Sequence, residues 1–160
     1  MNVSDLLAEV ITGPVTKRAI TNHHVLNEAY AYGSAFSRGM RIDLKGLTIL
    51  LISGTASIDD RGNTVHIGDL RAQLRRTFDN ITGLLASEGA TWHDVVRTTC
   101  YLRDIERDYK EFNKERAAFY EEQGLDPLPA STGIQAILCR PDLLVEIEAI
   151  AMFRRESPGE

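Results

Sequence analysis

The chain has few of the features that mark secreted, membrane-bound or metal-binding proteins. Its 160 residues include two cysteines, Cys100 and Cys139, which are too few for a disulfide framework and lack the spacing of a metal site. No apolar run approaches the length of a membrane span, and the first residues carry no basic segment followed by an apolar core. We therefore expect a soluble, cytoplasmic protein with reduced thiols and no membrane partner.

An excess of basic residues is also absent. The chain carries 18 lysines and arginines against 23 aspartates and glutamates, a formal net charge of −5, which offers no general surface for nucleic acid. The four histidines form no metal constellation, and segment 54–57 (Gly-Thr-Ala-Ser) lacks the glycine pattern and lysine of a phosphate-binding loop. The expected ligand is a small molecule, with no nucleic acid, metal or other cofactor.

Repeats, low-complexity tracts and long linkers are missing too, so one domain is expected to account for most of the chain. With 43% hydrophobic and 26% charged residues, the chain can bury a sizeable core. Residues 1–30 are predicted to form an N-terminal helix and a connection. Ser4 is expected to cap a helix over about 5–10, Gly13 and Pro14 to stop it, and residues 15–30 to contain a short strand. The domain itself is predicted to span residues 31–155.

The hydrophobic periodicity of this domain predicts an α+β fold. Strands are expected over 31–42 and, as an apolar run buried on both faces, over 47–53. After a turn at 59–63, two amphipathic helices are expected, one from Asp69 to Gly89 and one over about 105–122. A capping box at 91–94 and a strand at 95–103 separate them. Strands over 131–138 and 143–153 are expected to form a hairpin around 139–142.

Two carboxylates in the last strand are the most informative feature of the sequence. Because side chains alternate along a strand, one face is apolar throughout and the other is mixed. The mixed face consists of Leu144, Glu146, Glu148, Ile150 and Met152. Ionised carboxylates seldom lie among apolar residues unless they are paired, hydrogen-bonded or in a cleft, so this face should meet something specific. The alternative is an exposed sheet face with two solvated glutamates.

The same face of the sheet is expected to combine both signs of charge. The helices are expected to cover Val96, Cys100, Ile134, Ala136, Val145 and Ile147. The opposite side is expected to present Arg97, Tyr101, Arg103, Ser131, Gln135, Cys139, Glu146 and Glu148. One domain cannot bury such a face alone, so a subunit boundary is expected there. A cleft lined by arginine, tyrosine, cysteine and glutamate suits the binding and protonation of a small anion.

Several short motifs between Tyr32 and Phe153 occur in a recognisable order. They include Gly68-Asp69 with Gln73, Asn80-Ile81, Tyr101-Leu-Arg-Asp104, Pro129-Ala130 and Glu146-Ile-Glu-Ala-Ile-Ala151. In order and spacing, these motifs resemble the RidA/YjgF family of small trimeric proteins. The resemblance implies a chorismate-mutase-like fold, with a mixed sheet backed by two helices, and a homotrimer with three equivalent clefts between subunits.

The resemblance also suggests roles for residues. Family members that act as enamine/imine deaminases hold the substrate carboxylate with an arginine just after the Pro-Ala motif, where this chain has Ser131. Serine cannot reproduce the rigid bidentate fork of arginine, so hydrolysis of amino-acid-derived imines in the usual manner is not expected. The acidic residue of the family corresponds to Glu146 and its first-strand aromatic residue to Tyr32. Its cysteine corresponds to Gly133 and is absent.

Around the cleft, the chain is similar to the C-terminal part of chorismatases, which hydrolyse the enolpyruvyl ether of chorismate. The similar segments are 54–58, 64–69 and 139–148. The similarity implies that Glu146 protonates the substrate and that Cys139 lines the pocket, although the N-terminal half of chorismatases has no counterpart here. A standalone trimer with such a cleft also resembles lyases that convert hydroxylaminobenzoate to a catechol acid with loss of ammonia.

These features together predict an enzyme that adds water to a planar or cyclic carboxylate and releases ammonia, with Glu146 as proton donor or base. Arg38 and Arg97 are the leading candidates to replace the missing clamp, although either could form a structural ion pair instead. The other predicted substrate contacts are Tyr32, Tyr101, Ser131, Gly133 and Cys139. Cys139 could also be a small apolar filler. Chorismatase-like hydrolysis and non-catalytic binding of a metabolite are the alternative functions.

Overall fold

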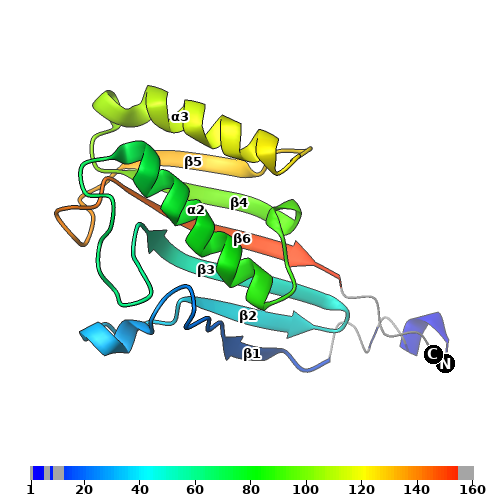
Figure 1. Ribbon diagram of the computed structural model, residues 1–160. Helices are drawn as coiled ribbons and strands as arrows, with labels where there is room; N and C mark the ends of the chain where they lie inside the picture. Colours follow the sequence, from blue (N-terminus) through cyan, green and yellow to red (C-terminus); the bar gives the residue numbers. More distant parts are fainter. Residues whose placement is uncertain (1, 6–7, 9–12, 155–160) are drawn as a thin grey trace.

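The protein has two layers, a six-stranded sheet and two long helices packed on one of its faces (Figure 1). The structure is a computed structural model and describes residues 2–5, 8 and 13–154, without the side chains of Tyr30 and Tyr32. In these residues the predicted α+β fold with a mixed sheet and two backing helices is confirmed. The predicted division between residues 1–30 and 31–155 stays a prediction.

The sheet is mixed because one of its strands follows a helical crossover. Its strands are β1 (Thr16–Ala19), β2 (Gly39–Leu44), β3 (Leu47–Ala56), β4 (Val95–Leu102), β5 (Ala130–Gln135) and β6 (Val145–Phe153). They lie in the order β1-β2-β3-β6-β4-β5, and only the β4–β5 pair is parallel. A parallel pair needs a long crossover, which helix α3 (Ile105–Glu122) supplies between these two strands.

The predicted hairpin between the last two strands is therefore wrong. β6 pairs with β3 on one side and with β4 on the other, so β4 separates it from β5. The physical reason is that β5 pairs with one edge of β4 after the helical crossover. β6 therefore pairs with the other edge of β4 and with β3. Segment 136–144 carries the chain across the end of β4 to reach it.

The N-terminal third also differs from the prediction. Residues 31–42 do not form one strand: a 3-10 turn at Ala29–Tyr32 and an irregular stretch precede β2. Gly33 has a φ of 84°, which ends the turn and which a β-strand cannot accommodate. The short strand expected within 15–30 is found as β1. Asn2, not Ser4, caps the helical residues 3–5, because its Oδ1 accepts from the Asp5 N–H at 2.9 Å. Most of the predicted 5–10 helix lies outside the described residues.

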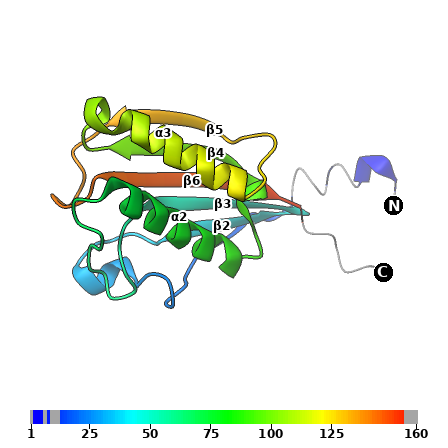
Figure 2. The same cartoon turned by 45° about the horizontal axis from the view of Figure 1, so that its top comes forward.

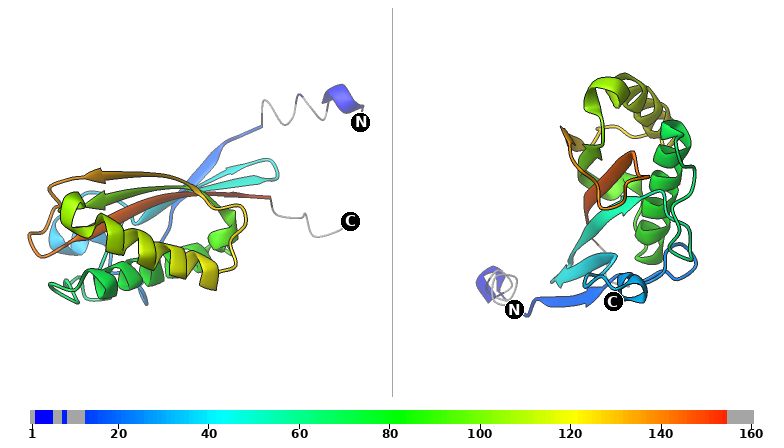
Figure 3. Two further views of the ribbon diagram at one scale, coloured as in Figure 1. Left: turned by 90° about the horizontal axis from the view of Figure 1, so that it is seen from above. Right: turned by 90° about the vertical axis from the view of Figure 1, so that its left-hand side faces the viewer.

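Both long helices begin and end close to their predicted limits. Asp69 caps helix α2 (Leu70–Ser87) by accepting from the backbone N–H of Ala72, and Asp104 caps α3 in the same way. Their apolar stripes meet over the sheet, where the rings of Phe78 and Phe119 stack with centroids 4.3 Å apart. The helices cover one side of the sheet and leave the other bare, as the further views in Figures 2 and 3 show.

The alternation predicted for β6 is confirmed, whereas two details of its neighbours differ. Val145, Ile147, Ala149 and Ala151 are buried under the helices, and Glu146 and Glu148 lie on the other, bare face. We call this bare side of the sheet the open face. In β3 only one side is buried: Leu50 and Ile52 face the helices, and Leu51 is exposed on the open face. In β4 a bulge between Val95 and Arg97 turns Val95 into the core in place of Val96.

The faces predicted for β5 are reversed. Its parallel register sets Ser131 beside Thr98 and Gly133 beside Cys100, so both lie on the helix side, and Ile134 lies beside Tyr101 on the open face. All six residues of this edge strand are exposed. A strand exposed on both sides has no buried face to specify its register, so the positions of its apolar residues were misleading.

Candidate active site

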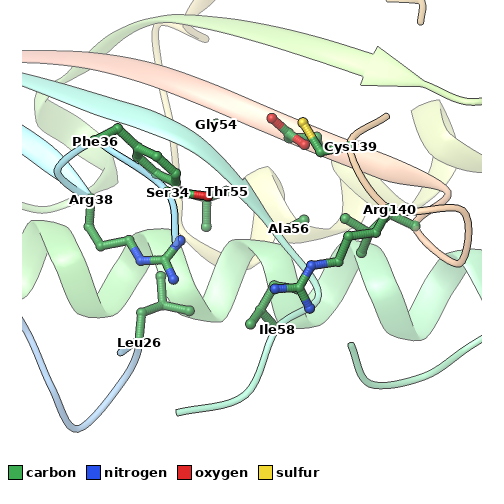
Figure 4. Close-up of a pocket in the computed structure, with 12 residues that line it drawn as sticks. Leu26, Ser34, Phe36, Arg38, Gly54, Thr55, Ala56, Ile58, Cys139 and Arg140 are labelled. Atoms are coloured by element: carbon green, nitrogen blue, oxygen red, sulfur yellow. The ribbon is translucent and has the colours of Figure 1, made fainter. Parts of the chain in front are cut away.

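A pocket opens between the ends of β3 and β6 and the segments around residues 36 and 140. It has a volume of about 120 Å³ and combines two arginines, one cysteine and one glutamate with an apolar wall. It is lined by Leu26, Ser34, Phe36, Arg38, Gly54, Thr55, Ala56, Ile58, Cys139, Arg140, Leu143 and Glu146. Figure 4 shows Arg38 and Arg140 approaching from opposite ends. Three of the predicted site residues, Arg38, Cys139 and Glu146, therefore line one pocket.

Glu146 is the acidic group of this pocket. It lies near the start of β6, paired with Ala56 of β3 on one side and Tyr101 of β4 on the other, and its side chain is half-buried. Among the described residues no group donates a hydrogen bond to its carboxyl. Burial, together with the negative charge of Glu148, raises the pKa of Glu146 above its ordinary value. The site thus favours a carboxyl that can hold a proton and release it.

Gly54 leaves the space that this carboxyl occupies. It lies in β3 where the register with β6 shifts between Ile52 and Thr55. A Cβ at Gly54 would overlap Oε1 of Glu146, so any other residue forces the carboxyl to move. The backbone conformation of Gly54 is an ordinary one, so the need for glycine here comes from close approach to Glu146.

Arg38 is buried and held in place by its neighbour Asn27. Its Nε donates to the Asn27 carbonyl at 2.8 Å and its Nη2 to Asn27 Oδ1 at 3.1 Å. Its guanidinium also lies over the ring of Phe36, with Cζ 5.5 Å from the centroid. These contacts fix the orientation of the guanidinium before any ligand arrives, which favours recognition of a planar anion.

Arg140 is a pocket residue that the sequence analysis missed. Its Nη1 donates to the Gly62 carbonyl at 2.7 Å and to Thr64 Oγ1 at 3.3 Å, so the turn after β3 holds it. The only signal in the sequence was its place beside Cys139 in the segment that resembles chorismatases. Neither charge nor periodicity distinguishes it from other surface arginines.

Gln73 of α2 fixes the segment that leads into Glu146. Its side chain is fully buried, its Nε2 donates to the Asp142 carbonyl at 2.8 Å, and its Oε1 accepts from the Leu144 N–H at 2.8 Å. A second hydrogen bond fixes Asp142, since Thr64 Oγ1 donates to its Oδ1 at 3.0 Å. One amide thus uses both its donor and its acceptor to set where β6 begins, and with it the position of Glu146.

Four other predicted residues, Tyr101, Arg97, Ser131 and Gly133, do not line the pocket. Tyr101 is next to Glu146 on the open face, and its hydroxyl donates to Glu148 Oε1 at 3.1 Å. Arg97 is on the same face, farther along β4, and donates to Thr132 Oγ1. The side chain of Tyr32 is outside the described part of the structure.

Ser131 and Gly133 are on the opposite face of the sheet from Glu146. Ser131 Oγ accepts from Arg116 Nη1 of α3 at 3.0 Å, and the other end of that guanidinium donates to Asn113 Oδ1 at 2.6 Å. A guanidinium group thus stands beside the serine, although it comes from a helix. Within one chain, these residues and Glu146 cannot contact the same small molecule.

The described part of the chain offers neither a metal cluster nor a membrane-spanning helix. No three or more histidine, cysteine, aspartate or glutamate side chains in this part of the chain are grouped so as to hold a metal ion. Among the same residues, no helix is both long and apolar enough to cross a bilayer.

The comparison with known proteins identifies the family. Residues 28–153 match the family described as Endoribonuclease L-PSP. A RutC family protein of Pyrococcus horikoshii is 32% identical over 108 residues, which is 68% of this chain and 82% of the relative. The 3-aminoacrylate deaminase RutC of Acinetobacter baylyi is 33% identical over 107 residues, 67% of this chain and 81% of the relative.

Solved structures agree with this result. The YjgF gene product of E. coli superposes with a TM-score of 0.70 and 25% identity, over 86% of this chain and 99% of that one. E. coli TdcF, solved with bound serine, gives a TM-score of 0.69 over 87% and 99% of the two chains, and at 21% identity it shows the shared fold alone. The chain therefore belongs to the Endoribonuclease L-PSP family, the RidA/YjgF group that its motifs resemble.

Proposed function

We propose that the protein is an enzyme that adds water to a small planar or cyclic carboxylate and releases ammonia, with Glu146 moving the proton. The observation that carries this proposal is the half-buried Glu146 carboxyl, which no described residue contacts as a hydrogen-bond donor, in a pocket that also contains Arg38 and Arg140. A carboxyl whose pKa is raised, in a pocket with two cationic groups, suits an anionic substrate that has to be protonated.

The chemistry needs one proton donor and one water. For an imine, the acid protonates nitrogen, water adds to the C=N carbon, and the C–N bond of the resulting aminoalcohol breaks to give a carbonyl and ammonia. For a hydroxylaminobenzoate, the N–O bond breaks with loss of water and a water adds to the neighbouring ring carbon, which gives an aminophenol. A second water then adds to the carbon that bears nitrogen in the imine tautomer of this aminophenol, and the C–N bond breaks to give the catechol and ammonia, so one water is consumed overall. In both reactions Glu146 would give its proton to the departing nitrogen and recover one from the attacking water.

The relatives support this reaction class. The Acinetobacter baylyi protein is named as a 3-aminoacrylate deaminase, and aminoacrylate is a small carboxylate whose nitrogen leaves as ammonia. Since this chain has Ser131 at the position of the arginine that the family resemblance implies, we expect weak or absent activity on imines of simple aliphatic amino acids.

Arg38 is the stronger of the two candidate clamps for the substrate carboxylate. Its guanidinium lines the pocket that contains Glu146, whereas Arg97 lies outside it. Cys139 completes the pocket wall. In this proposal Tyr101 flanks the pocket, and the predicted contacts Arg97, Ser131 and Gly133 would reach a substrate only from a neighbouring subunit.

We also propose that the active form is a homotrimer. Leu51, Ile134 and Met152 are exposed on the open face, which one chain cannot cover. Burying this face between subunits would bring β5 of one chain toward the pocket of another. Light scattering at micromolar concentration should give three times the chain mass, and a stable monomer would remove the basis for a shared cleft.

Chorismatase-like hydrolysis of an enolpyruvyl ether is the second candidate function. The specific observation in its favour is that Cys139 and Glu146, the two residues that the chorismatase resemblance singles out, line the same pocket. The same acid would then protonate the enol ether instead of nitrogen, and pyruvate would be released.

A substrate screen tests these functions together. The purified protein is incubated with aliphatic and aromatic imines, hydroxylaminobenzoates and chorismate, and ammonia and pyruvate are measured. Release of ammonia supports the proposed function and release of pyruvate the chorismatase-like one. If neither product forms while one of the compounds binds, the protein is a metabolite-binding module and the proposal is wrong.

A further inference from the structure

The two glutamates of β6 lie in different hydrogen-bonding environments. Glu146 and Glu148 are two residues apart on the open face, so their Cα atoms are roughly 7 Å apart along the strand. Glu148 accepts a hydrogen bond from the Tyr101 hydroxyl at 3.1 Å, whereas no described residue donates one to Glu146. Tyr101 is the register partner of Glu146, yet its hydroxyl contacts Glu148, whose own register partner is Thr99.

We propose that Tyr101 and Glu148 form a positioning pair that keeps the proton on Glu146, so that the site contains one charged and one protonated carboxyl. The catalytic consequence of this pair rests on the function proposed above, but its effect on Glu146 does not. Glu148 would touch no substrate and would act only through Glu146.

The physical basis is repulsion between like charges combined with one hydrogen-bond donor. Two carboxylates at this separation disfavour double ionisation, and a hydrogen-bond donor such as the Tyr101 hydroxyl favours charge on the carboxylate that it contacts. Burial, and then the hydrogen bond to Glu148, raise the pKa of Tyr101, so its hydroxyl keeps its proton and remains a donor over the whole physiological range. Pairs of acids whose environments differ in this way commonly divide the acid and base roles between them.

The other charged and titratable groups around Glu146 do not replace this pair. Arg38 comes from the segment before β2, Arg140 and Cys139 from the segment before β6, and none of them donates a hydrogen bond to its carboxyl. Arg103, at the end of β4, donates to the backbone carbonyls of Leu143 and Arg140 instead. Besides burial, the group that raises the pKa of Glu146 is Glu148.

This arrangement accounts for the order of the two proton transfers proposed above for Glu146. A carboxyl that starts protonated acts first as an acid toward the departing nitrogen and only afterwards as a base toward water. The rate should then fall on the alkaline side of the pKa of Glu146, because the reactive form loses its proton there.

Titration of Glu146 in protein labelled with ¹³C at glutamate carboxyls tests the pair without any substrate. The Glu146 signal is assigned as the one that disappears in Glu146→Gln. We expect Glu148→Gln to lower the midpoint of Glu146, so that at fixed pH its ratio of protonated to ionised form falls about threefold or more. Tyr101→Phe should shift the midpoint in the same direction by less. The matched controls are Glu121→Gln and Tyr109→Phe, two exposed residues of α3, which should leave it unchanged.

The outcomes separate this inference from the proposed function. An unchanged Glu146 midpoint in a folded Glu148→Gln protein overturns the pair, as does a shift of the same size in the controls. If the midpoint moves as expected but Glu146→Gln keeps full ammonia release, the pair stands and the proposed function is wrong. With an active substrate, the alkaline limb of the rate profile should also move to lower pH in Glu148→Gln.

Discussion

The backbone of Gly54 lies directly against the carboxyl of Glu146, so close that a Cβ at position 54 would overlap Oε1. The obstacle would be the end of a flexible side chain, so Gly54→Ala should fold but turn the carboxyl out of its position. Displacements of about 1 Å at a reacting group can cost about a hundredfold in rate. We expect ammonia release by Gly54→Ala to fall tenfold to about a hundredfold, measured as kcat on the substrate found in the screen.

The melting temperature of the same variant is the control. It should change by only a few degrees, because the clash is relieved at the pocket surface. A large loss of stability would mean that Gly54 serves the packing of β3, and unchanged kcat would mean that the position of Glu146 does not matter.

Stability should depend on pH through Glu146. Since its pKa is raised by folding, the native state binds this proton more tightly than the unfolded chain does. The contribution to stability is complete below the ordinary pKa of 4.5 and is lost as pH rises through the raised value. Glu146→Gln should therefore unfold at a higher temperature than the wild type near pH 7, and the difference should vanish at about pH 4. Equal melting curves at both pH values would contradict this environment.

The two candidate clamps should differ in their effect on ligand binding. Loss of a charge-assisted contact to a carboxylate costs on the order of 1.5–3 kcal/mol, or one to two decades in affinity. Titration calorimetry should show this loss for Arg38→Ala, whose side chain lines the pocket, and a smaller loss for Arg97→Ala. The clamp assignment fails if neither substitution weakens binding beyond a few-fold while the assembly stays intact.

A buried ion-pair cluster ties β2 to the end of α2 and should dominate stability at that end of the sheet. Glu88 is 3% exposed and pairs with Arg41, which is also buried, and with Arg18, which is 58% exposed. Without Glu88, the buried Arg41 guanidinium loses one of its anionic partners. Glu88→Ala should therefore lower the free energy of unfolding, measured in urea, by about 3 kcal/mol. Arg18→Ala, which removes only the exposed partner, should cost less than about 1 kcal/mol. Similar losses in the two variants would contradict this distinction.

Sequence reasoning succeeded where local chemistry decides the structure. Helix α3 was expected over 105–122 and is found at Ile105–Glu122, because Asp104 caps one end and Gly124, with a φ of 65°, closes the other. The alternation of β6 was equally plain, since one of its faces is entirely apolar. Glu146 was therefore on the correct side of the correct strand.

Prediction from the sequence failed where the structure depends on which strands pair with one another. Nothing local in 130–138 shows that β5 lies beside β4, and a wrong partner reversed the faces of Ser131 and Gly133. Arg140 was missed for a related reason. Its place in the pocket depends on carbonyl and hydroxyl groups at Gly62 and Thr64, nearly 80 residues earlier in the chain.

The most direct test of the account is ammonia release by Glu146→Gln compared with the wild type on the same substrate. Glutamine keeps the shape of the side chain and most of its hydrogen bonding but cannot donate and recover the proton, so kcat should fall about a hundredfold or more while KM changes little. Thr99→Ser on β4 serves as a control for handling and folding and should keep wild-type rates. Turnover by Glu146→Gln within a few-fold of the wild type would contradict the assignment of Glu146 as the group that moves the proton.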